Sequence, residues 1–121
     1  MDVNRLTGRI ITLAYRVQEA LGPGLTERIY ANALAAALRN DGLEAEREAS
    51  IPVLYEGEEV GMIRADLVVE GRVVVEAKVA PEVTDAHLDQ LRRYLDWGGY
   101  EAGLLIAFGG SKPEVRRING R

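Results

Sequence analysis

Apolar residues recur every three or four positions along the first 40 residues, which is the spacing of one face of an α-helix. Residues 4–20 carry one such stripe, and Leu21-Gly22-Pro23-Gly24 ends that helix and turns the chain. A second stripe runs from Leu25 to Asn40, followed by the helix-ending pair Asp41-Gly42. The pattern therefore predicts two consecutive helices joined by a glycine-rich turn.

The middle of the chain changes to apolar runs separated by turn residues, which is typical of β-strands. The predicted strands cover residues 46–55, 60–70 and 73–79. Pro52 indicates an edge position or a bulge in the first of them, because proline cannot donate to a strand ladder. We expect these three strands to form consecutive hairpins.

The last third of the chain begins after Pro81, with a helical stripe over residues 84–97. The continuous apolar run at residues 102–108 predicts a strand covered on both faces. The tail after Gly110 is a short basic segment. The order ααβββαβ predicts an α/β fold of three layers, with a mixed β-sheet flanked by helices.

Length and composition narrow the possible kinds of site. A chain of 121 residues is typical of one domain, over residues 1–121. The absence of cysteine excludes disulfides, cysteine-ligated zinc or iron–sulfur sites and cysteine nucleophiles, and the single histidine excludes a cage of several histidines. Without a signal-like start or a membrane-spanning apolar run, we expect a cytoplasmic, bacterial protein that does not bind membranes.

The charge is uneven along the chain, although the net charge is only −4. Residues 1–40 hold five Arg against three acids, residues 41–80 hold ten acids against four bases, and residues 81–121 hold six of each. This distribution lacks the overall basic surface of a tight, non-specific nucleic-acid binder. The bases are 13 Arg but only two Lys, Lys78 and Lys112. A lysine kept in so arginine-rich a chain hints at a role for a compact ammonium group.

Three of the charged residues in the predicted strands are candidates for chemistry. Glu76 and Lys78 are two apart and so share one face of a strand, and Asp66 interrupts the apolar run before them. A three-residue hairpin loop over residues 70–72 places Asp66 opposite Glu76, whereas a two-residue loop places them on opposite faces. We expect the three-residue loop.

Two facing carboxylates repel each other unless a cation lies between them. Mg²⁺ prefers hard oxygen ligands, so Asp66, Glu76 and the backbone carbonyl of Ala77 form a candidate Mg²⁺ site. Lys78 is then placed to orient or activate a water molecule, or to balance the charge of a phosphate. The alternative is an ion pair between Glu76 and Lys78 on a half-exposed sheet.

Further candidates lie on the predicted helices. Glu27 and Tyr30 are one turn apart at the start of the second helix, and Gln90 and Tyr94 share a face of the third helix, one turn after His87. Each has an ordinary structural alternative. Glu27 could stabilise the helix dipole, Tyr30 could belong to the core, Gln90 could be surface and His87 could cap its helix.

Together, these motifs resemble the small GxxExxY proteins of the PD-(D/E)xK nuclease superfamily, over nearly the whole chain. The matching elements are Gly24, Glu27 and Tyr30 for the name motif, Arg64-Ala65-Asp66 for the metal-binding aspartate, Glu76-Ala77-Lys78 for the E-x-K element, Gln90 to Tyr94 for the Q-x-x-x-Y helix of the RecB-like branch, and the strand Gly103 to Phe108. Their order along the chain also agrees with that of the family.

The resemblance implies a restriction-endonuclease-like core of helix, three strands, helix and strand. It implies Mg²⁺ or Mn²⁺ held by Asp66 and Glu76, with Glu27 approaching from its helix and Lys78 assisting the attacking water. The catalytic set is thus Asp66, Glu76, Lys78 and Glu27. The expected substrate contacts are Gln90, Tyr94, Tyr30, Arg64 and His87. The expected reaction is metal-dependent hydrolysis of a phosphodiester in DNA.

Two other functions stay open at this point. The first is a non-catalytic module that binds nucleic acid or protein and retains the nuclease fold. The second is an oligomeric structural protein whose acidic cluster is a salt-bridge network. A small acidic chain also leaves little surface for gripping a duplex, so a second copy or a partner protein could extend it. Trp97 and Tyr100 are candidate aromatic contacts for such an interface.

Overall fold

The computed structural model describes all residues from 1 to 121 and begins with two helices. α1 spans Val3–Leu21 and α2 spans Glu27–Asn40, which confirms both predicted helices. The carboxylate of Asp2 caps α1 by accepting a hydrogen bond of 2.8 Å from the Arg5 N–H. Gly22 then ends α1 with a φ of +72°, a conformation that favours glycine.

The rest of the chain forms a five-stranded sheet and a third helix. The elements are β1 (Ala45–Tyr55), β2 (Glu58–Val69), β3 (Val73–Lys78), α3 (Asp85–Gly98), β4 (Ala102–Ala107) and β5 (Glu114–Asn119). The strand order is β1-β2-β3-β4-β5, and only the β3–β4 pair is parallel. The predicted α/β class with a mixed sheet and flanking helices is confirmed.

β5 is an element that the sequence pattern did not predict. Its apolar residues Val115 and Ile118 are three apart, so the segment lacks the alternation of a half-buried strand. It nevertheless pairs antiparallel with the whole length of β4. The neighbouring strand therefore imposes the extended conformation on this segment.

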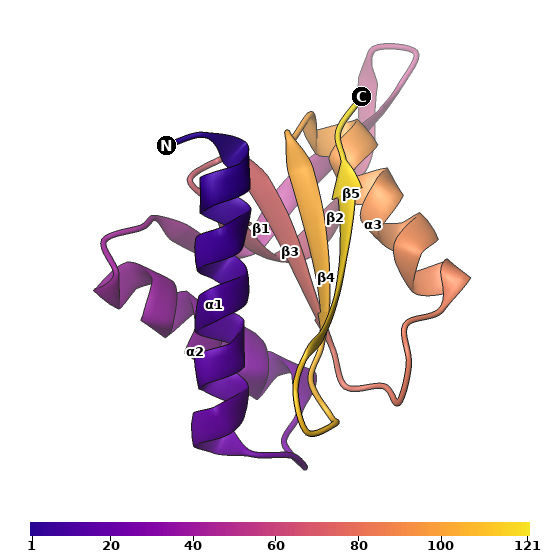
Figure 1. Ribbon diagram of the computed structural model, residues 1–121. Coiled ribbons are helices and arrows are strands. Elements are labelled where there is room, and N and C mark those ends of the chain that lie inside the picture. Colours follow the sequence, from indigo (N-terminus) through magenta and orange to yellow (C-terminus); the bar gives the residue numbers. More distant parts are fainter.

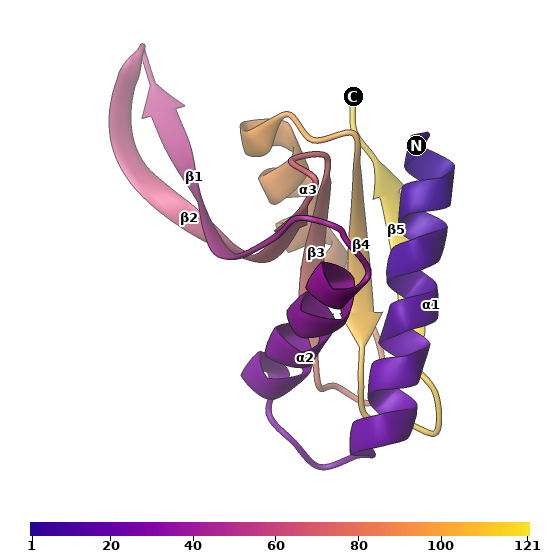
Figure 2. The ribbon, with the colours of Figure 1, turned by 90° about the vertical axis from the view of Figure 1, so that its left-hand side faces the viewer.

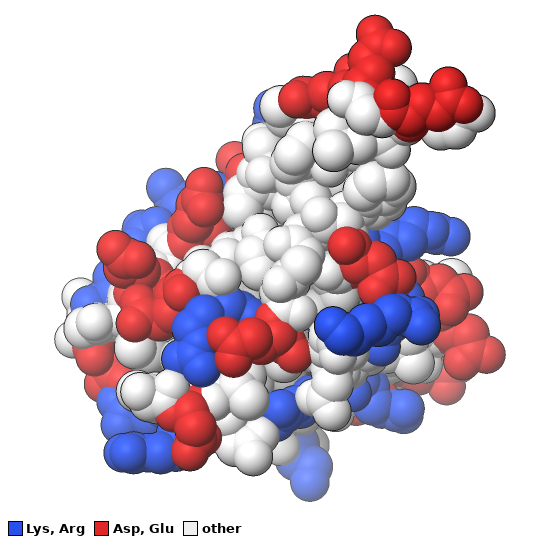
Figure 3. Space-filling model, turned by 90° about the horizontal axis from the view of Figure 1, so that it is seen from above, with Lys and Arg blue, Asp and Glu red and all other residues white.

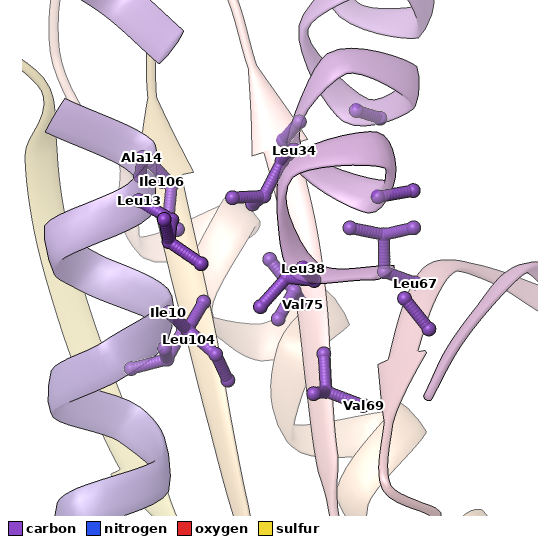
Figure 4. Packing of buried hydrophobic residues seen from close by; sticks show 14 of the residues in the cluster. Ile10, Leu13, Ala14, Leu34, Leu38, Leu67, Val69, Val75, Leu104 and Ile106 are labelled. Atoms are coloured by element: carbon purple, nitrogen blue, oxygen red, sulfur yellow. The ribbon is translucent and has the colours of Figure 1, made fainter. Parts of the chain in front are cut away.

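The helices cover the two faces of the sheet, with α1 and α2 on one face and α3 on the other (Figure 1). Under α1 and α2 lies a cluster of 21 buried residues, here called the larger core. Its members include Ile10, Leu13, Ala14, Leu34, Leu38, Leu67, Val69, Val75, Leu104 and Ile106, which point toward one another between the two helices and the strands (Figure 4). This face buries most of the apolar surface.

The face under α3 holds a second cluster of nine buried residues, here called the smaller core. Its members are Ala49, Ile51, Ala65, Val68, Val74, Leu91, Tyr94, Leu95 and Leu105. Gly103 on β4 allows α3 to pack closely, because a Cβ atom there would lie 2.9 Å from Cδ1 of Leu91. The smaller core thus brings α3 against the middle of the sheet.

β1 and β2 are longer than the other strands, and their joined ends extend beyond the sheet as a hairpin, here called the arm (residues 50–64; Figure 2). At the base of the arm, the side chains of β1 switch from one face of the sheet to the other. Ala45 lies in the larger core but Ala49 in the smaller core, although residues four apart in a regular strand share a face. Glu48, between them, has a φ of +51°. This left-handed residue therefore turns the strand over.

The outer part of the arm is exposed. Acidic side chains gather at its far end, beyond a stretch of uncharged surface (Figure 3). These acids are Glu56, Glu58 and Glu59. None of the three helices is both long enough and apolar enough to span a membrane.

Candidate active site

Two carboxylates meet where β2 separates from β3. The two strands pair through Leu67 with Val75, Val68 with Val74 and Val69 with Val73. This is the register of the three-residue loop, which confirms that prediction and makes Asp66 and Glu76 the next facing pair. The pairing ends there because β2 bends away into the arm. The separating strands leave a fork that these two side chains occupy.

Each carboxylate replaces a backbone hydrogen bond that the separated strands no longer make. The Asp66 N–H donates to Oε1 of Glu76 at 2.9 Å, and the Ala77 N–H donates to Oδ2 of Asp66 at 2.8 Å. Buried N–H groups need such partners. The two acids are therefore held in place by the backbone of each other's strand, a rigid arrangement that suits a catalytic site.

Burial and mutual repulsion raise the pKa of both acids. Glu76 is only 4% exposed, and its burial, followed by the charge of Asp66, raises its pKa to about 8. Burial also raises the pKa of Asp66, against the opposing effects of the Ala77 N–H and of Lys78. The pair therefore shares a proton near neutral pH when no cation is bound.

Glu27 and Lys78 approach this pair from α2 and β3. The Val79 N–H donates to Oε1 of Glu27 at 3.3 Å, and the charge of Glu27 contributes to the raised pKa of Asp66. The half-buried Lys78 lowers the pKa of Asp66 and of Glu76 by its positive charge. However, Lys78 forms no salt bridge within 4.0 Å. The alternative of a Glu76–Lys78 ion pair is therefore not observed.

The donor set suits a hard divalent cation. Asp66 and Glu76 each use one oxygen for a backbone N–H, so Oδ1 of Asp66 and Oε2 of Glu76 have no backbone donor. Two carboxylates with raised pKa values gain from a nearby positive charge. No group of three or more Asp, Glu and His side chains is arranged as a ready-made metal site. The arrangement thus fits Mg²⁺, which commonly takes one or two carboxylates and keeps several waters.

α3 contributes a protonated phenol next to the carboxylates. Gln90 Nε2 donates to the Tyr94 hydroxyl at 3.3 Å, so the predicted i, i+4 pair is formed. Burial, followed by the charges of Glu76 and Asp66, raises the pKa of Tyr94 to about 12. Tyr94 therefore keeps its proton at all physiological pH values and remains a hydrogen-bond donor at this site.

Tyr30 does not reach the site, so its predicted substrate contact is wrong. It is fully buried, and its ring stacks on Phe108 with 4.8 Å between ring centroids. Its hydroxyl donates to the Gly22 carbonyl at 2.5 Å, which ties the turn before α2 to the core. The core alternative for Tyr30 is the observed one.

The structure places His87 in a helix cap and Arg64 on the exposed surface of β2. His87 completes the cap of α3: its N–H donates to Oγ1 of Thr84, and its Nδ1 accepts from the Thr84 N–H. The capping alternative thus describes His87 in this structure. Arg64 is exposed on β2, two residues before Asp66, and pairs across the arm with Ser50. Neither residue contacts the carboxylates through a hydrogen bond or an ion pair.

A polar pocket adjoins the site and contains residues that the sequence analysis did not select. It has a volume of about 420 Å³ and lies between α2 and β1. Glu27 and Asp66 line it together with Arg28, Ala31, Asn32, Arg47 and Glu48. Arg28 and Asn32 are four residues apart on α2 and so share one helix face just after Glu27, which was the one available indication in the sequence. A larger hollow of about 540 Å³, around Arg39 and Leu43, includes neither carboxylate of the fork.

Comparison with known proteins supports the same architecture. Residues 4–118 match a family model described as the PD-(D/E)XK nuclease superfamily. Among solved structures, the crystal structure of SSO0001 is similar, with a TM-score of 0.59 and 25% sequence identity. The similarity covers 76% of this chain and 48% of that one, so this chain spans about half the length of SSO0001. A search of curated proteins found no match.

Proposed function

This chain belongs to the PD-(D/E)XK nuclease superfamily, and from this membership we propose that it is a divalent-metal-dependent nuclease acting on DNA. The observation that carries the proposal is the fork between β2 and β3. There Asp66 and Glu76 face each other, each held by the other strand's backbone, with Lys78 two residues further along β3. Within the superfamily, Gly24, Glu27 and Tyr30 favour the GxxExxY group.

Asp66 and Glu76 are the proposed metal-binding residues. The backbone carbonyl of Ala77 and the carboxylate of Glu27, directly or through a water, complete the proposed set. A bound Mg²⁺ or Mn²⁺ supplies positive charge that stabilises the transition state of phosphodiester hydrolysis. Glu76 holds a proton near neutral pH, so loading the site displaces that proton.

Lys78 is the proposed residue that positions the attacking water and balances phosphate charge. Its ammonium forms no salt bridge, and it lies close enough to both carboxylates to lower their pKa values. The Tyr94 hydroxyl accepts a hydrogen bond from Gln90, which leaves its own phenolic proton available to donate at this site. Arg64 and His87 are candidate contacts for the more distant parts of the nucleic acid. We also propose that a second copy or a partner protein extends this surface.

Cleavage assays test the proposal directly. Plasmid, linear duplex, single-stranded DNA and RNA are each incubated with the wild-type protein in Mg²⁺, Mn²⁺ or EDTA. We expect metal-dependent cleavage of DNA that falls by roughly 100-fold or more in Asp66→Asn and in Lys78→Ala. Lys112→Ala, an exposed lysine outside the fork, is the matched control and should retain wild-type activity.

Thermal unfolding gives an independent test of the metal site. A cation that binds only the folded protein raises its melting temperature. We expect millimolar Mn²⁺ or Mg²⁺ to raise the melting temperature of the wild type but not of Asp66→Ala. Absence of cleavage for every substrate, or activity that survives in Asp66→Asn, would contradict the nuclease proposal. Metal-dependent DNA binding without cleavage would favour the binding-module alternative.

A further inference from the structure

We infer that the polar pocket between α2 and β1 binds a backbone phosphate of the nucleic-acid strand, next to the phosphate that is cleaved. The inference rests on the proposed function, because it assigns this pocket to the same substrate. Glu27 and Asp66 line the pocket, so it shares a wall with the proposed active site. A strand that crosses the fork therefore passes directly over the pocket.

The pocket offers hydrogen-bond donors that the protein itself does not use. Arg47 and Asn32 are exposed, and neither side chain forms a hydrogen bond or an ion pair within the chain. Arg28 lies 3.3 Å from Glu48, but these side chains are 75% and 58% exposed. An ion pair so exposed contributes little energy, so a phosphate can replace Glu48 as the partner of Arg28.

The residues that line the pocket suit the phosphate backbone of a nucleic acid better than its bases. Ala31 is the only apolar residue in the pocket, and no aromatic residue lines it. Binding of bases to single strands relies on aromatic side chains for stacking, which are missing here. Guanidinium and amide groups are instead the usual partners of phosphate oxygens. The chemistry of the lining thus indicates a phosphodiester ligand.

The backbone at Glu48 is arranged so that two consecutive residues face the pocket. Arg47 and Glu48 both line it, whereas neighbours in a regular strand point to opposite faces. The positive φ of Glu48 makes this possible. Such a conformation is unfavourable for a non-glycine residue, and strain of this kind is concentrated at functional sites. Arg47 shares the face of Ala45, which lies in the larger core, and the left-handed residue brings Glu48 to that face as well.

The charge of the pocket couples phosphate binding to the cation. Three carboxylates (Glu27, Glu48 and Asp66) and two guanidinium groups (Arg28 and Arg47) line it, which leaves a net charge of −1. A divalent cation at Asp66 changes this local charge to +1. Phosphate binding at the pocket is therefore favourable only in the loaded protein, and the coupling is reciprocal.

Fluorescence anisotropy with labelled oligonucleotides tests the inference without relying on cleavage. Binding is measured in Ca²⁺ and in EDTA for the wild type, Arg47→Gln, Glu48→Gln and Arg16→Gln. Arg16 is also an exposed arginine, on α1 and outside the pocket, and serves as the matched control. In Ca²⁺ we expect Arg47→Gln to weaken binding by about 3- to 10-fold and to reduce the salt dependence by about one counterion, with no change for Arg16→Gln.

Glu48→Gln is expected to tighten oligonucleotide binding, and removal of the cation with EDTA is expected to abolish the effect of Arg47→Gln. Glu48→Gln removes a negative charge and frees Arg28, so it should tighten binding by roughly threefold. In EDTA, Arg47→Gln should bind as weakly as the wild type. Unchanged affinity of Arg47→Gln in Ca²⁺, or an equal loss for Arg16→Gln, would overturn the inference. Competition by inorganic phosphate is a further check. If phosphate at a concentration just sufficient to occupy one site displaces the oligonucleotide, the pocket binds free phosphate and the inference is overturned.

This design separates failure of the inference from failure of the nuclease proposal. If DNA is cleaved and Arg47→Gln has an unchanged KM and oligonucleotide affinity, the nuclease proposal stands and the phosphate pocket is refuted. If no substrate is cleaved but Arg47→Gln weakens Ca²⁺-dependent binding, the pocket stands and the catalytic proposal is refuted. Circular dichroism and melting temperature confirm that each variant is folded.

Discussion

The two faces of the sheet differ in the side chains that they bury. The larger core, under α1 and α2, is a cluster of 21 residues in which Tyr30 supplies the one polar group. The smaller core, under α3, has nine residues and adjoins the buried acid Glu76. Burying a charge is costly, whereas burying apolar surface is favourable. One face therefore supplies the stability that lets the other keep an unfavourable but reactive group.

The largest expected effect separates stability from chemistry. Leu34 is fully buried in the larger core, so Leu34→Ala should lower the free energy of unfolding by about 3 kcal/mol. The rate of any cleavage per folded molecule should change far less, because Leu34 is buried in the larger core and does not line the pocket beside the fork. Urea denaturation measures the first quantity. The exposed Leu54 on the arm is the matched control, and Leu54→Ala should cost less than about 0.5 kcal/mol.

The pH dependence of stability tests the cost of burying Glu76. Its pKa is about 8 in the folded protein against 4.5 without the protein environment, so the folded state holds a proton that the unfolded state has lost. In the metal-free protein, the contribution of Glu76 to the free energy of unfolding is therefore greatest below about pH 4.5 and falls as the pH rises to 8. The slope reaches at most roughly 1.4 kcal/mol per pH unit.

Glu76→Gln removes this titration and should flatten that part of the profile. Chemical denaturation in EDTA at a series of pH values measures the effect. Glu59→Gln, at the exposed end of the arm, should leave the profile unchanged. A decline of the same steepness in wild type and Glu76→Gln would show that Glu76 is not responsible.

Two glycine substitutions compare the tightness of the smaller core with that of an open helix surface. Gly103→Ala places a Cβ atom 2.9 Å from Cδ1 of Leu91 and should destabilise the protein by about 1–3 kcal/mol. Gly8→Ala, within α1, meets no atom within 4 Å and should stabilise it by about 0.5–1 kcal/mol. Melting temperatures of both variants give the comparison. If both substitutions raised the melting temperature, α3 would pack against β4 too loosely to exclude a Cβ atom at position 103.

The smallest expected effect concerns the Tyr94 hydroxyl. Tyr94→Phe removes the hydroxyl that accepts a hydrogen bond from Gln90 and that feels the charges of Glu76 and Asp66. We expect a loss of stability of about 1 kcal/mol or less, together with a fewfold lower rate of DNA cleavage. Steady-state kinetics should place the change in kcat. A change confined to stability would assign Tyr94 to the smaller core alone.

The sequence predicted the fold through its strongest patterns. Helical stripes placed both N-terminal helices, and loop length together with the alternation of apolar residues placed Asp66 opposite Glu76. β5 escaped prediction because its pairing with β4 comes from tertiary structure rather than from its own pattern.

The residues that surround the two carboxylates were harder to predict from the sequence. The buried position of Tyr30 depends on its stacking with Phe108, which lies 78 positions later. The presence of Glu48 beside Arg47 in the pocket depends on a left-handed conformation at Glu48, which is rare for glutamate and has no sequence pattern. Candidate residues for the fork could thus be named in advance, but the pocket beside it could not.

The arm also governs how this protein behaves at high concentration. β1 is an edge strand, and the apolar side chains of Leu54, Tyr55, Val60 and Met62 are 48–66% exposed near the end of the hairpin. Such a strand is a template for edge-to-edge aggregation. Glu56, Glu58 and Glu59 act as gatekeepers, because their like charges keep the tips of two copies apart. Replacing those three glutamates with glutamine would remove this repulsion, and the arm would then be the first site of self-association.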